Sequence, residues 1–360
     1  MQLSSFTPGK NNNFNLIRII AALAVLVGHS FALLRQPEPF SQLLGMSLGS
    51  MAVDIFFIAS GFLVAGSLLI KQSMSEYVLA RILRIYPALL TMLLVTVFLL
   101  GAFFTSFSLA SYYADSQIYL YLIKCLTLIS GVRYYLPGVF DSNPFKGAVN
   151  GSLWTLVYEV KMYIYLAMLW LTSSLVKHHR VKFFEYLIVL CTALAIALVF
   201  VHHFYIKDES NAVRLFFMFF SGASYWILKE RVKLLGPLFG GVSVALLVSP
   251  FFNQQVFFVL YQLGIAYLLF YLAYIPAGTI RKYNAAGDYS YGVYIYAFPV
   301  QQSVVALFPD MSVLQMMLLS ALITLILAIL SWHLIERRAL RLKEFLIRNA
   351  GPSLQLYPQR

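Results

Sequence analysis

The sequence predicts an all-helical, polytopic membrane protein with about ten transmembrane helices and both termini in the cytoplasm. Hydrophobic residues make up 61% of the 360 residues and charged residues only 11%, whereas an average soluble protein has about 25% charged residues. The apolar residues form runs long enough to cross a bilayer. Most Lys and Arg residues lie between these runs, on one predicted side of the membrane.

Ten segments have the length and apolar character of membrane spans. They are approximately 15–34, 50–70, 84–105, 152–175, 184–204, 213–229, 235–250, 255–275, 287–308 and 312–335. We expect one integral membrane domain over residues 1–360, because no internal repeat, low-complexity linker or soluble region interrupts this pattern. The apolar segment 117–132 is too short to span and predicts an interfacial or re-entrant helix.

The orientation follows from the basic residues. With the N-terminus in the cytoplasm, eighteen Lys and Arg residues lie on the inner side and six on the outer side, with Arg18 and Lys161 left inside spans. The net charge of +12 is therefore explained by the positive-inside rule, and we expect no nucleic-acid partner. Arg18 interrupts the first apolar run and no cleavage site follows it, which favours an uncleaved first span over a signal peptide.

The first span, NLIRIIAALAVLVGHSFALL, carries two polar residues, Arg18 and His29. Eleven positions bring a helix back to within about 20° of its starting face and correspond to a rise of about 16 Å. Both side chains therefore lie on one face at different depths. Snorkelling of Arg18 and simple packing of His29 are the alternatives, but ionisable groups inside a span are costly and are more often functional.

Four polar residues from four predicted spans are expected at one depth, in the outer half of the membrane. Counting helical rises from the predicted boundaries places His29, Asp54, Glu159 and Gln301 at a similar level. Each has an alternative. Asp54 lies close enough to the boundary to be interfacial, Glu159 has the local cation Lys161, and Gln301 can hydrogen-bond between helices.

Arg81 and Arg84 lie three residues apart at the cytoplasmic start of the third predicted span. They share a helix face, and their guanidinium groups suit phosphate recognition. Ordinary positive-inside anchoring is the alternative. The two cysteines, Cys125 and Cys191, lie in or beside apolar runs and indicate neither a disulfide framework nor a metal site.

These residues together resemble acyltransferase family 3, a family of integral membrane acyltransferases. Arg18 and His29 match its signature of Arg, ten residues and His. The other matching segments, in order, are GSMAVDIFFIASGFLVAGS, RILRIYP with Arg81 and Arg84, NGSLWTLVYEVKMY, GDYSYGVYIYAFPVQQ and HLIERRA.

The resemblance implies transfer of an acyl group, often acetyl, from cytoplasmic acyl-CoA to a hydroxyl group of a carbohydrate or lipid-linked acceptor. Candidate acceptors are cell-surface polysaccharide, lipopolysaccharide and lipid-linked glycans. The location implied is a bacterial inner membrane, with membrane lipids as neighbours. Acyl-CoA, with acetyl-CoA favoured, is then a donor substrate rather than a bound cofactor, and no metal is expected.

The resemblance implies roles for three groups of residues. Arg18, Arg81 and Arg84 are expected near the donor, and His29 is expected to be the essential base. Imidazole suits this role because its pKa lies near working pH, and Glu159 or Asp54 are the candidates to orient it. Candidates for the acceptor site are Trp154, Tyr163 and Gln301.

Two departures from the family pattern stand out. Ala297 occupies a position where many members have His, so a proton relay through that residue is not expected here. Many members also carry an esterase-like domain outside the membrane, and we expect the stand-alone form. Two other classes of function fit ten spans with buried charges: a glycan or lipid transporter, and a non-catalytic partner in glycan assembly. The transporter is less favoured because repeat symmetry and paired broken spans are not evident.

Overall fold

The computed structural model describes residues 1–7, 9, 11–208 and 210–349, apart from the side chains of 177, 344, 345 and 347–349. Helices account for most of this part of the chain. No β-strand occurs in it, and β-pairing is limited to isolated bridges. The predicted all-helical class is therefore confirmed for the described residues.

A helix lies in each of the ten predicted spans, and six helical stretches are long and apolar enough to cross a membrane. These six are Phe14–Leu33, Leu48–Lys71, Met74–Phe104, Arg180–Ile206, Gln254–Tyr274 and Val313–Lys343. The other four helices are shorter or more polar. The count of ten crossings and the cytoplasmic termini stay predictions. Two of the charges counted for orientation, Lys10 and Arg360, lie outside the described residues.

The chain divides into two compact units, which are described separately. Unit 1 comprises Met1–Ala21, Pro39–Ile70 and Met162–Gly287, and unit 2 comprises Ala22–Glu38, Lys71–Lys161 and Asp288–Arg360. The helices α1, Phe14–Leu33, and α8, Trp154–Ser173, each contribute residues to both units. The expectation of one domain over the whole chain stays a prediction.

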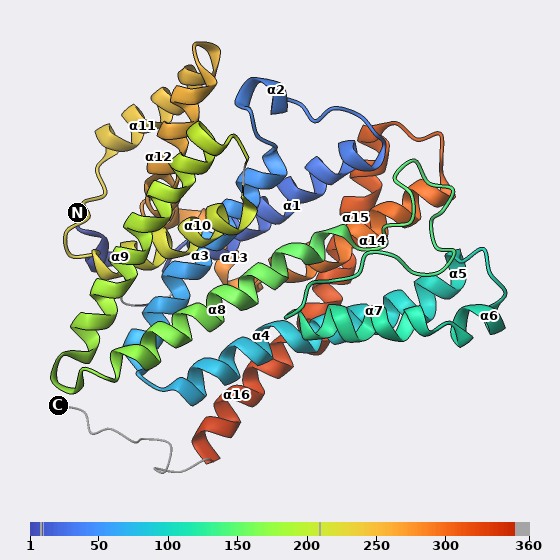
Figure 1. Cartoon of the computed structure of the whole chain (residues 1–360), viewed down its shortest axis with the longest axis horizontal. Helices are drawn as coiled ribbons and strands as arrows, with labels where there is room; N and C mark the ends of the chain where they lie inside the picture. Colours follow the sequence, from blue (N-terminus) through green and yellow to red (C-terminus); the bar gives the residue numbers. More distant parts are fainter. Residues whose placement is uncertain (8, 10, 209, 350–360) are drawn as a thin grey trace. The chain divides into compact units, whose positions relative to one another are not determined.

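Unit 1 is built around the long helix α3. Its helices, besides parts of α1 and α8, are α2 (Ser41–Leu44), α3 (Leu48–Lys71), α9 (Arg180–Val201), α10 (Asn211–Ile227), α11 (Gly236–Val248), α12 (Gln254–Tyr274) and α13 (Tyr283–Ala286). A π-helical segment, His202–Ile206, extends α9. In Figure 1, α9 lies alongside α10 and α11 alongside α12. The first turn of α12 is fixed by Asn253, whose side chain accepts hydrogen bonds from two backbone N–H groups.

Helices α3 and α10 cross at two glycines. A Cβ atom added to Gly61 would lie 1.8 Å from the Phe219 carbonyl oxygen, and one added to Gly222 would lie 2.0 Å from the Ile58 carbonyl oxygen. The two backbones therefore approach more closely than any side chain permits. Small residues at such crossings are how membrane helices gain close van der Waals contact in the absence of a hydrophobic driving force.

Unit 2 contains the second half of α1, the start of α8 and the helices at the end of the chain. Its other helices are α4 (Met74–Val95), α5 (Ala102–Phe104), α6 (Leu109–Ala114), α7 (Ser116–Thr127), α14 (Ser290–Leu307), α15 (Val313–Ser331) and α16 (Arg337–Asn349). Two π-helical segments extend α4 and α15, Thr96–Gly101 and Trp332–Glu336. Figure 1 shows α16 and α7 running beside α4, and α14 paired with α15.

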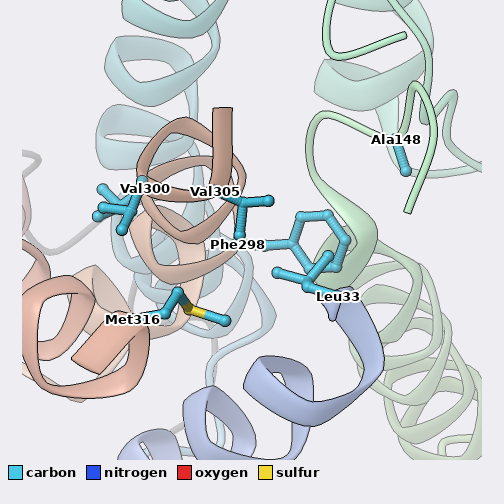
Figure 2. Close-up of a cluster of buried hydrophobic side chains, with 7 residues drawn as sticks. Leu33, Ala148, Phe298, Val300, Val305 and Met316 are labelled. Carbon is cyan, nitrogen blue, oxygen red and sulfur yellow. The ribbon is translucent and has the colours of Figure 1, made fainter. Parts of the chain in front are cut away.

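A cluster of buried apolar side chains forms the core of unit 2 near the end of α1. Figure 2 shows the Phe298 ring beside Leu33, with Val300, Val305 and Met316 close by. Ala148 joins this cluster from the loop that precedes α8. This part of the loop thus belongs to the core.

The short apolar segment 117–132 contains α7, Ser116–Thr127. Its buried face carries Ile118, Tyr121 and Cys125, and it packs against α4. The helix ends at Leu128, which adopts a left-handed conformation with φ of 55°. A helix in this segment is therefore confirmed, while its re-entrant or interfacial character stays open.

We expect Gly61→Ala and Gly222→Ala to lower the melting temperature of the detergent-solubilised protein. Forcing an extra carbon into a filled contact costs about 1–3 kcal/mol, which outweighs the 0.5–1 kcal/mol that Ala otherwise gains over Gly in a helix.

Gly241→Ala in α11 is the matched control, because nothing lies within 4 Å of the position its Cβ would occupy. It should leave the melting temperature unchanged or raise it. Equal melting temperatures for all three variants would contradict the close crossing.

Candidate functional site

A proline inside α14 is the starting point for the geometry of unit 2. Pro299 has no backbone N–H and leaves the carbonyl group four residues earlier, at Ile295, without its helical donor. The Asn150 side chain supplies the missing bond, since its Nδ2 donates to the Ile295 oxygen at 3.0 Å. This contact joins two of the sequence motifs, NGSLW and FPVQQ, for a specific physical reason.

His29 lies against the same part of α14. Its ring meets the Phe298 ring edge to face, with centroids 5.2 Å apart. Gln301, one turn further along, donates from Nε2 to the Leu26 carbonyl oxygen at 2.8 Å and to Ser30 Oγ at 2.7 Å. These two acceptors flank His29 on α1, so α14 fixes the turn of α1 that carries the imidazole.

The imidazole has one accessible side. His29 Nδ1 is enclosed and has no hydrogen-bond partner among the described residues, whereas the side chain as a whole is only half-buried. Nε2 is therefore the nitrogen that a hydroxyl group can reach. Gln301 bonds the turn of α1 that carries His29, and it acts as the inter-helix bridge that was the alternative to an acceptor contact.

The start of α8 packs on an earlier part of α14. The Tyr294 hydroxyl donates to the Ser152 carbonyl oxygen at 3.0 Å and also bonds Thr155 Oγ1. Glu159 interacts electrostatically with Tyr291 and Tyr294. These tyrosines lie seven and ten residues before Gln301, about 10–15 Å along the helix axis. Tyr294 is also only four residues before Phe298, the residue that meets the His29 ring, so the expected depth match of Glu159 and His29 stays a prediction.

The other polar groups of this helix start contact rings. The Lys161 ammonium lies 5.3 Å from the centroid of the Tyr158 ring, a cation–π contact. The Trp154 ring packs edge to face on the Tyr158 ring, with centroids 5.7 Å apart. The structure thus gives Lys161 an aromatic partner on its own helix.

Arg84 forms the centre of an ion-pair cluster, which we call the Arg84 cluster. Its Nη2 donates to Asp288 Oδ2 at 2.6 Å, and its Nη1 lies 3.9 Å from Glu336 Oε2. Glu336 also accepts from Ser331 Oγ at 3.0 Å. The three charged side chains are largely buried, with 15%, 11% and 3% of their surfaces exposed.

Asp288 has a second task in the Arg84 cluster. Its Oδ1 accepts hydrogen bonds from the backbone N–H and hydroxyl group of Ser290, at the first residue of α14. It therefore caps α14 while pairing with a side chain from α4. This explains why α14 begins at Ser290, three residues after the predicted boundary.

Sequence reasoning did not single out Asp288, Glu336 or Asn150. All three lie inside segments that carried the family resemblance, namely GDYSYG, HLIERRA and NGSLW. The signal that identifies them is the presence of a charged or amide side chain at the edge of an apolar run, where it needs a partner.

The two remaining donor candidates are Arg81 and Arg18. Arg81 is half-buried on α4, one turn before Arg84. Arg18 lies in unit 1, with its guanidinium carbon 5.9 Å from the centroid of the Phe56 ring. Arg18 and His29 both lie on α1, so the predicted rise of about 16 Å between them holds along one unbroken helix.

In unit 1, Asp54 forms a buried ion pair. Its Oδ2 accepts from the Tyr261 hydroxyl at 3.0 Å and lies 3.5 Å from Arg214 Nη1. Its side chain is fully buried within unit 1. Tyr163 hydrogen-bonds Ser60 through its hydroxyl group at 3.0 Å. The catalytic role of Asp54 and the acceptor role of Tyr163 stay predictions.

Cys125 does not offer an alternative nucleophile. Burial raises the pKa of the Cys125 thiol to about 12, so this thiol stays protonated and unreactive at neutral pH. Within the described part of the chain, no group of three or more His, Cys, Asp or Glu side chains is placed to hold a metal ion.

Taken together, the helical spans and the polar contacts of these motifs define an integral membrane acyltransferase. Residues 11–337 match the family model described as an acyltransferase domain. The chain belongs to this family, acyltransferase family 3, which confirms the resemblance seen in its sequence and favours an enzyme over a transporter.

Two characterised relatives resemble the chain over almost its full length. An O-acetyl transferase of Shigella phage Sf6 is 32% identical over 92% of this chain and 96% of its own. Nodulation protein 10 of Rhizobium leguminosarum bv. viciae is 26% identical over 94% of this chain and 96% of its own. No solved structure matches the chain significantly.

We expect Arg84→Ala to destabilise the protein by about 3–5 kcal/mol, because it leaves Asp288 and Glu336 buried without their cation. Thermal denaturation of the solubilised protein measures this loss. Adding Asp288→Asn to Arg84→Ala should recover part of it. Arg81→Ala, one turn away, serves as the comparison and should cost less. A parent-like melting temperature for Arg84→Ala would show that the cluster contributes nothing to the fold.

Proposed function

We propose that this protein is an O-acyltransferase, in the first instance an O-acetyltransferase, that uses cytoplasmic acyl-CoA and acylates a hydroxyl group of a glycan. The acceptor would be a cell-surface polysaccharide, lipopolysaccharide or lipid-linked glycan. The phage relative described as an O-acetyl transferase supports the acyl group. The observation that supports the proposal is the His29 imidazole, on a turn of α1 that α14 holds by two hydrogen bonds.

The proposed donor site lies on the predicted cytoplasmic side of the protein. Acyl-CoA carries several phosphate groups, and Arg18, Arg81 and Arg84 are the cations proposed to attract them. Since the Nη1 and Nη2 atoms of Arg84 face carboxylates, its proposed role is to hold the structure of the donor site. Direct phosphate contact then falls mainly to Arg81 and Arg18.

The proposed reaction is a direct transfer. His29 Nε2 removes the proton of the acceptor hydroxyl as its oxygen attacks the thioester carbonyl carbon. The tetrahedral intermediate collapses, the carbon–sulfur bond breaks and the ester forms. The thiolate of CoA leaves and takes up a proton, and the imidazolium returns to its neutral form. No covalent acyl-enzyme is required.

The proposed supporting residues act around this step. Glu159 and Asp54 are the candidates to stabilise charge on the imidazole, and Trp154, Tyr163 and Gln301 are the candidates for the acceptor side. Because Gln301 already binds α1, its proposed contribution is to position His29. Ten spans, cytoplasmic termini and an inner-membrane location complete the proposal. They put the donor mouth inside and His29 closer to the outer surface.

We expect His29→Ala to abolish transfer while the protein stays folded and still binds acyl-CoA. Removing a general base typically lowers the rate about 10²–10⁴-fold. The measurement is transfer of labelled acetyl from acetyl-CoA to deacylated surface polysaccharide by the purified protein. Glu159→Gln should lose less activity, since it would stabilise the imidazolium without taking the proton.

Two controls accompany this measurement. Acetyl-CoA binding separates a lost base from a lost donor site, and size-exclusion chromatography checks folding. His29→Gln keeps a hydrogen-bonding side chain against Phe298 without a base and should be as inactive as His29→Ala. Near-parent transfer by either variant would refute the mechanism.

A further inference from the structure

A small, partly open cavity lies in unit 1 where the ends of α9, α10 and α12 meet. Its polar lining comes from His202, His203, Ser210, Arg214 and Gln262, and Phe258 supplies an apolar wall. Its volume is about 20 Å³, which is room for one water molecule or one hydroxyl group. None of the proposed catalytic or donor residues lines it.

Gln262 is the unusual feature of this cavity. The residue is 2% exposed, and both its amide nitrogen and its amide oxygen are enclosed without a hydrogen-bond partner among the described residues. Buried amide groups are normally bonded at both ends, since leaving them unpaired costs free energy. Gln262 lines the polar cavity, and an amide pairs well with a hydroxyl group, which can accept and donate in return.

The charges around the cavity favour a neutral ligand. Arg214 lies 3.5 Å from Asp54 through Nη1 and donates to Asn211 Oδ1 through Nη2 at 3.1 Å. Its charge is thus compensated by the Asp54 carboxylate, and its position is fixed. The small cavity therefore favours a neutral hydroxyl group, whereas the cation Lys207 belongs to the lining of the adjoining cleft.

An aromatic surface adjoins the cavity. The His203 ring stacks on the Phe258 ring, with centroids 3.6 Å apart and planes 7° from parallel. His203 Nε2 also hydrogen-bonds Gln255 Oε1 at 2.9 Å. A surface cleft of about 300 Å³ begins at His203 and extends to Phe204, Lys207 and Gln255. Flat rings beside a few polar groups are typical of sites for small organic ligands.

The position of the cavity matches the proposed acceptor side. The predicted orientation puts the end of α9 and the starts of α10 and α12 at the outer surface. We propose that the cavity and the adjoining cleft form a subsite for a neutral pyranose unit of the glycan acceptor. One sugar hydroxyl bonds the Gln262 amide, and the ring packs near His203. This inference rests on the proposed function, of which it defines the substrate contact.

Gln262→Met tests the subsite, because it keeps the side-chain length and removes both hydrogen-bonding groups. If Gln262 serves a ligand, Gln262→Met should raise the KM for deacylated polysaccharide about tenfold and leave the KM for acetyl-CoA unchanged. The melting temperature should stay the same or rise, because the unpaired buried amide destabilises the ligand-free protein. Loss of acceptor affinity without loss of stability is an outcome that a structural role does not produce.

Thr324→Val is the matched control. Thr324 Oγ1 is also buried without a partner among the described residues, but it lies on α15 in unit 2. Thr324→Val should keep or raise the melting temperature and leave both KM values unchanged. Should Gln262→Met fail to fold, Gln262→Asn, which withdraws the amide by one carbon, takes its place and should weaken acceptor use.

A binding measurement separates this inference from the proposed function. Saturation-transfer NMR of the parent protein in a detergent without sugar groups would use methyl α-D-glucopyranoside and methyl α-L-rhamnopyranoside. At least one should bind the parent and lose its signal with Gln262→Met. If the parent transfers no acetyl group but binds a glycoside through Gln262, the proposed function fails and the subsite stands. No binding of either glycoside, or an unchanged signal and acceptor KM in Gln262→Met, would overturn the subsite.

Discussion

The fold of this enzyme depends on a constraint of its solvent: a polar group inside a membrane span needs a partner, because hydrocarbon supplies none. The missing N–H of Pro299 is answered by Asn150 at the Ile295 carbonyl oxygen. Arg84 forms ion pairs with Asp288 and Glu336. Asp54 forms an ion pair with Arg214 and accepts a hydrogen bond from Tyr261. Each answer joins segments far apart in sequence, so these pairs set which helices lie together in each unit.

Contacts of the same kind fix the positions of the candidate site residues. In unit 2, Gln301 and Phe298 fix the turn of α1 that carries His29, and the Arg84 cluster joins the middle of α4 and the start of α14 to the π-helical segment that extends α15. A base works best when its rotamer and surroundings are held before the substrate arrives. The polar contacts therefore stabilise unit 2 and fix the surroundings of His29, the proposed base.

Much of the helical framework was predictable, because apolar runs specify spans. The first span was predicted at 15–34 and the helix is Phe14–Leu33. Helix α4, which corresponds to the third predicted span, begins at Met74, ten residues before its predicted start of 84. The Ser73 hydroxyl caps this helix by accepting a hydrogen bond from the Glu76 N–H. Arg81 and Arg84 consequently lie within the helix rather than at its end.

The partners of the polar residues were not predictable. Arg84 and Asp288 are 204 residues apart, and no local pattern encodes that pairing. The same depth was expected for Glu159 and His29, and that expectation stays a prediction. Counting the helical rise per residue gives the depth of a residue along one span. It does not give the tilt of the neighbouring helices or their register. Gln262 was visible as a polar residue within an apolar run, but only the structure shows that it faces a cavity.

The most direct test of the central claim is the sidedness of transfer. The protein would be reconstituted in sealed vesicles, with its orientation fixed by labelling of single cysteines, and labelled acetyl-CoA supplied on one side only. We predict acetylation of a glycan on the outer face when acetyl-CoA is on the side of residues 71–83, and none when it is on the opposite side. Equal transfer from either side, or transfer only to acceptor on the donor's own side, would contradict an enzyme that joins a cytoplasmic donor to an outer hydroxyl group.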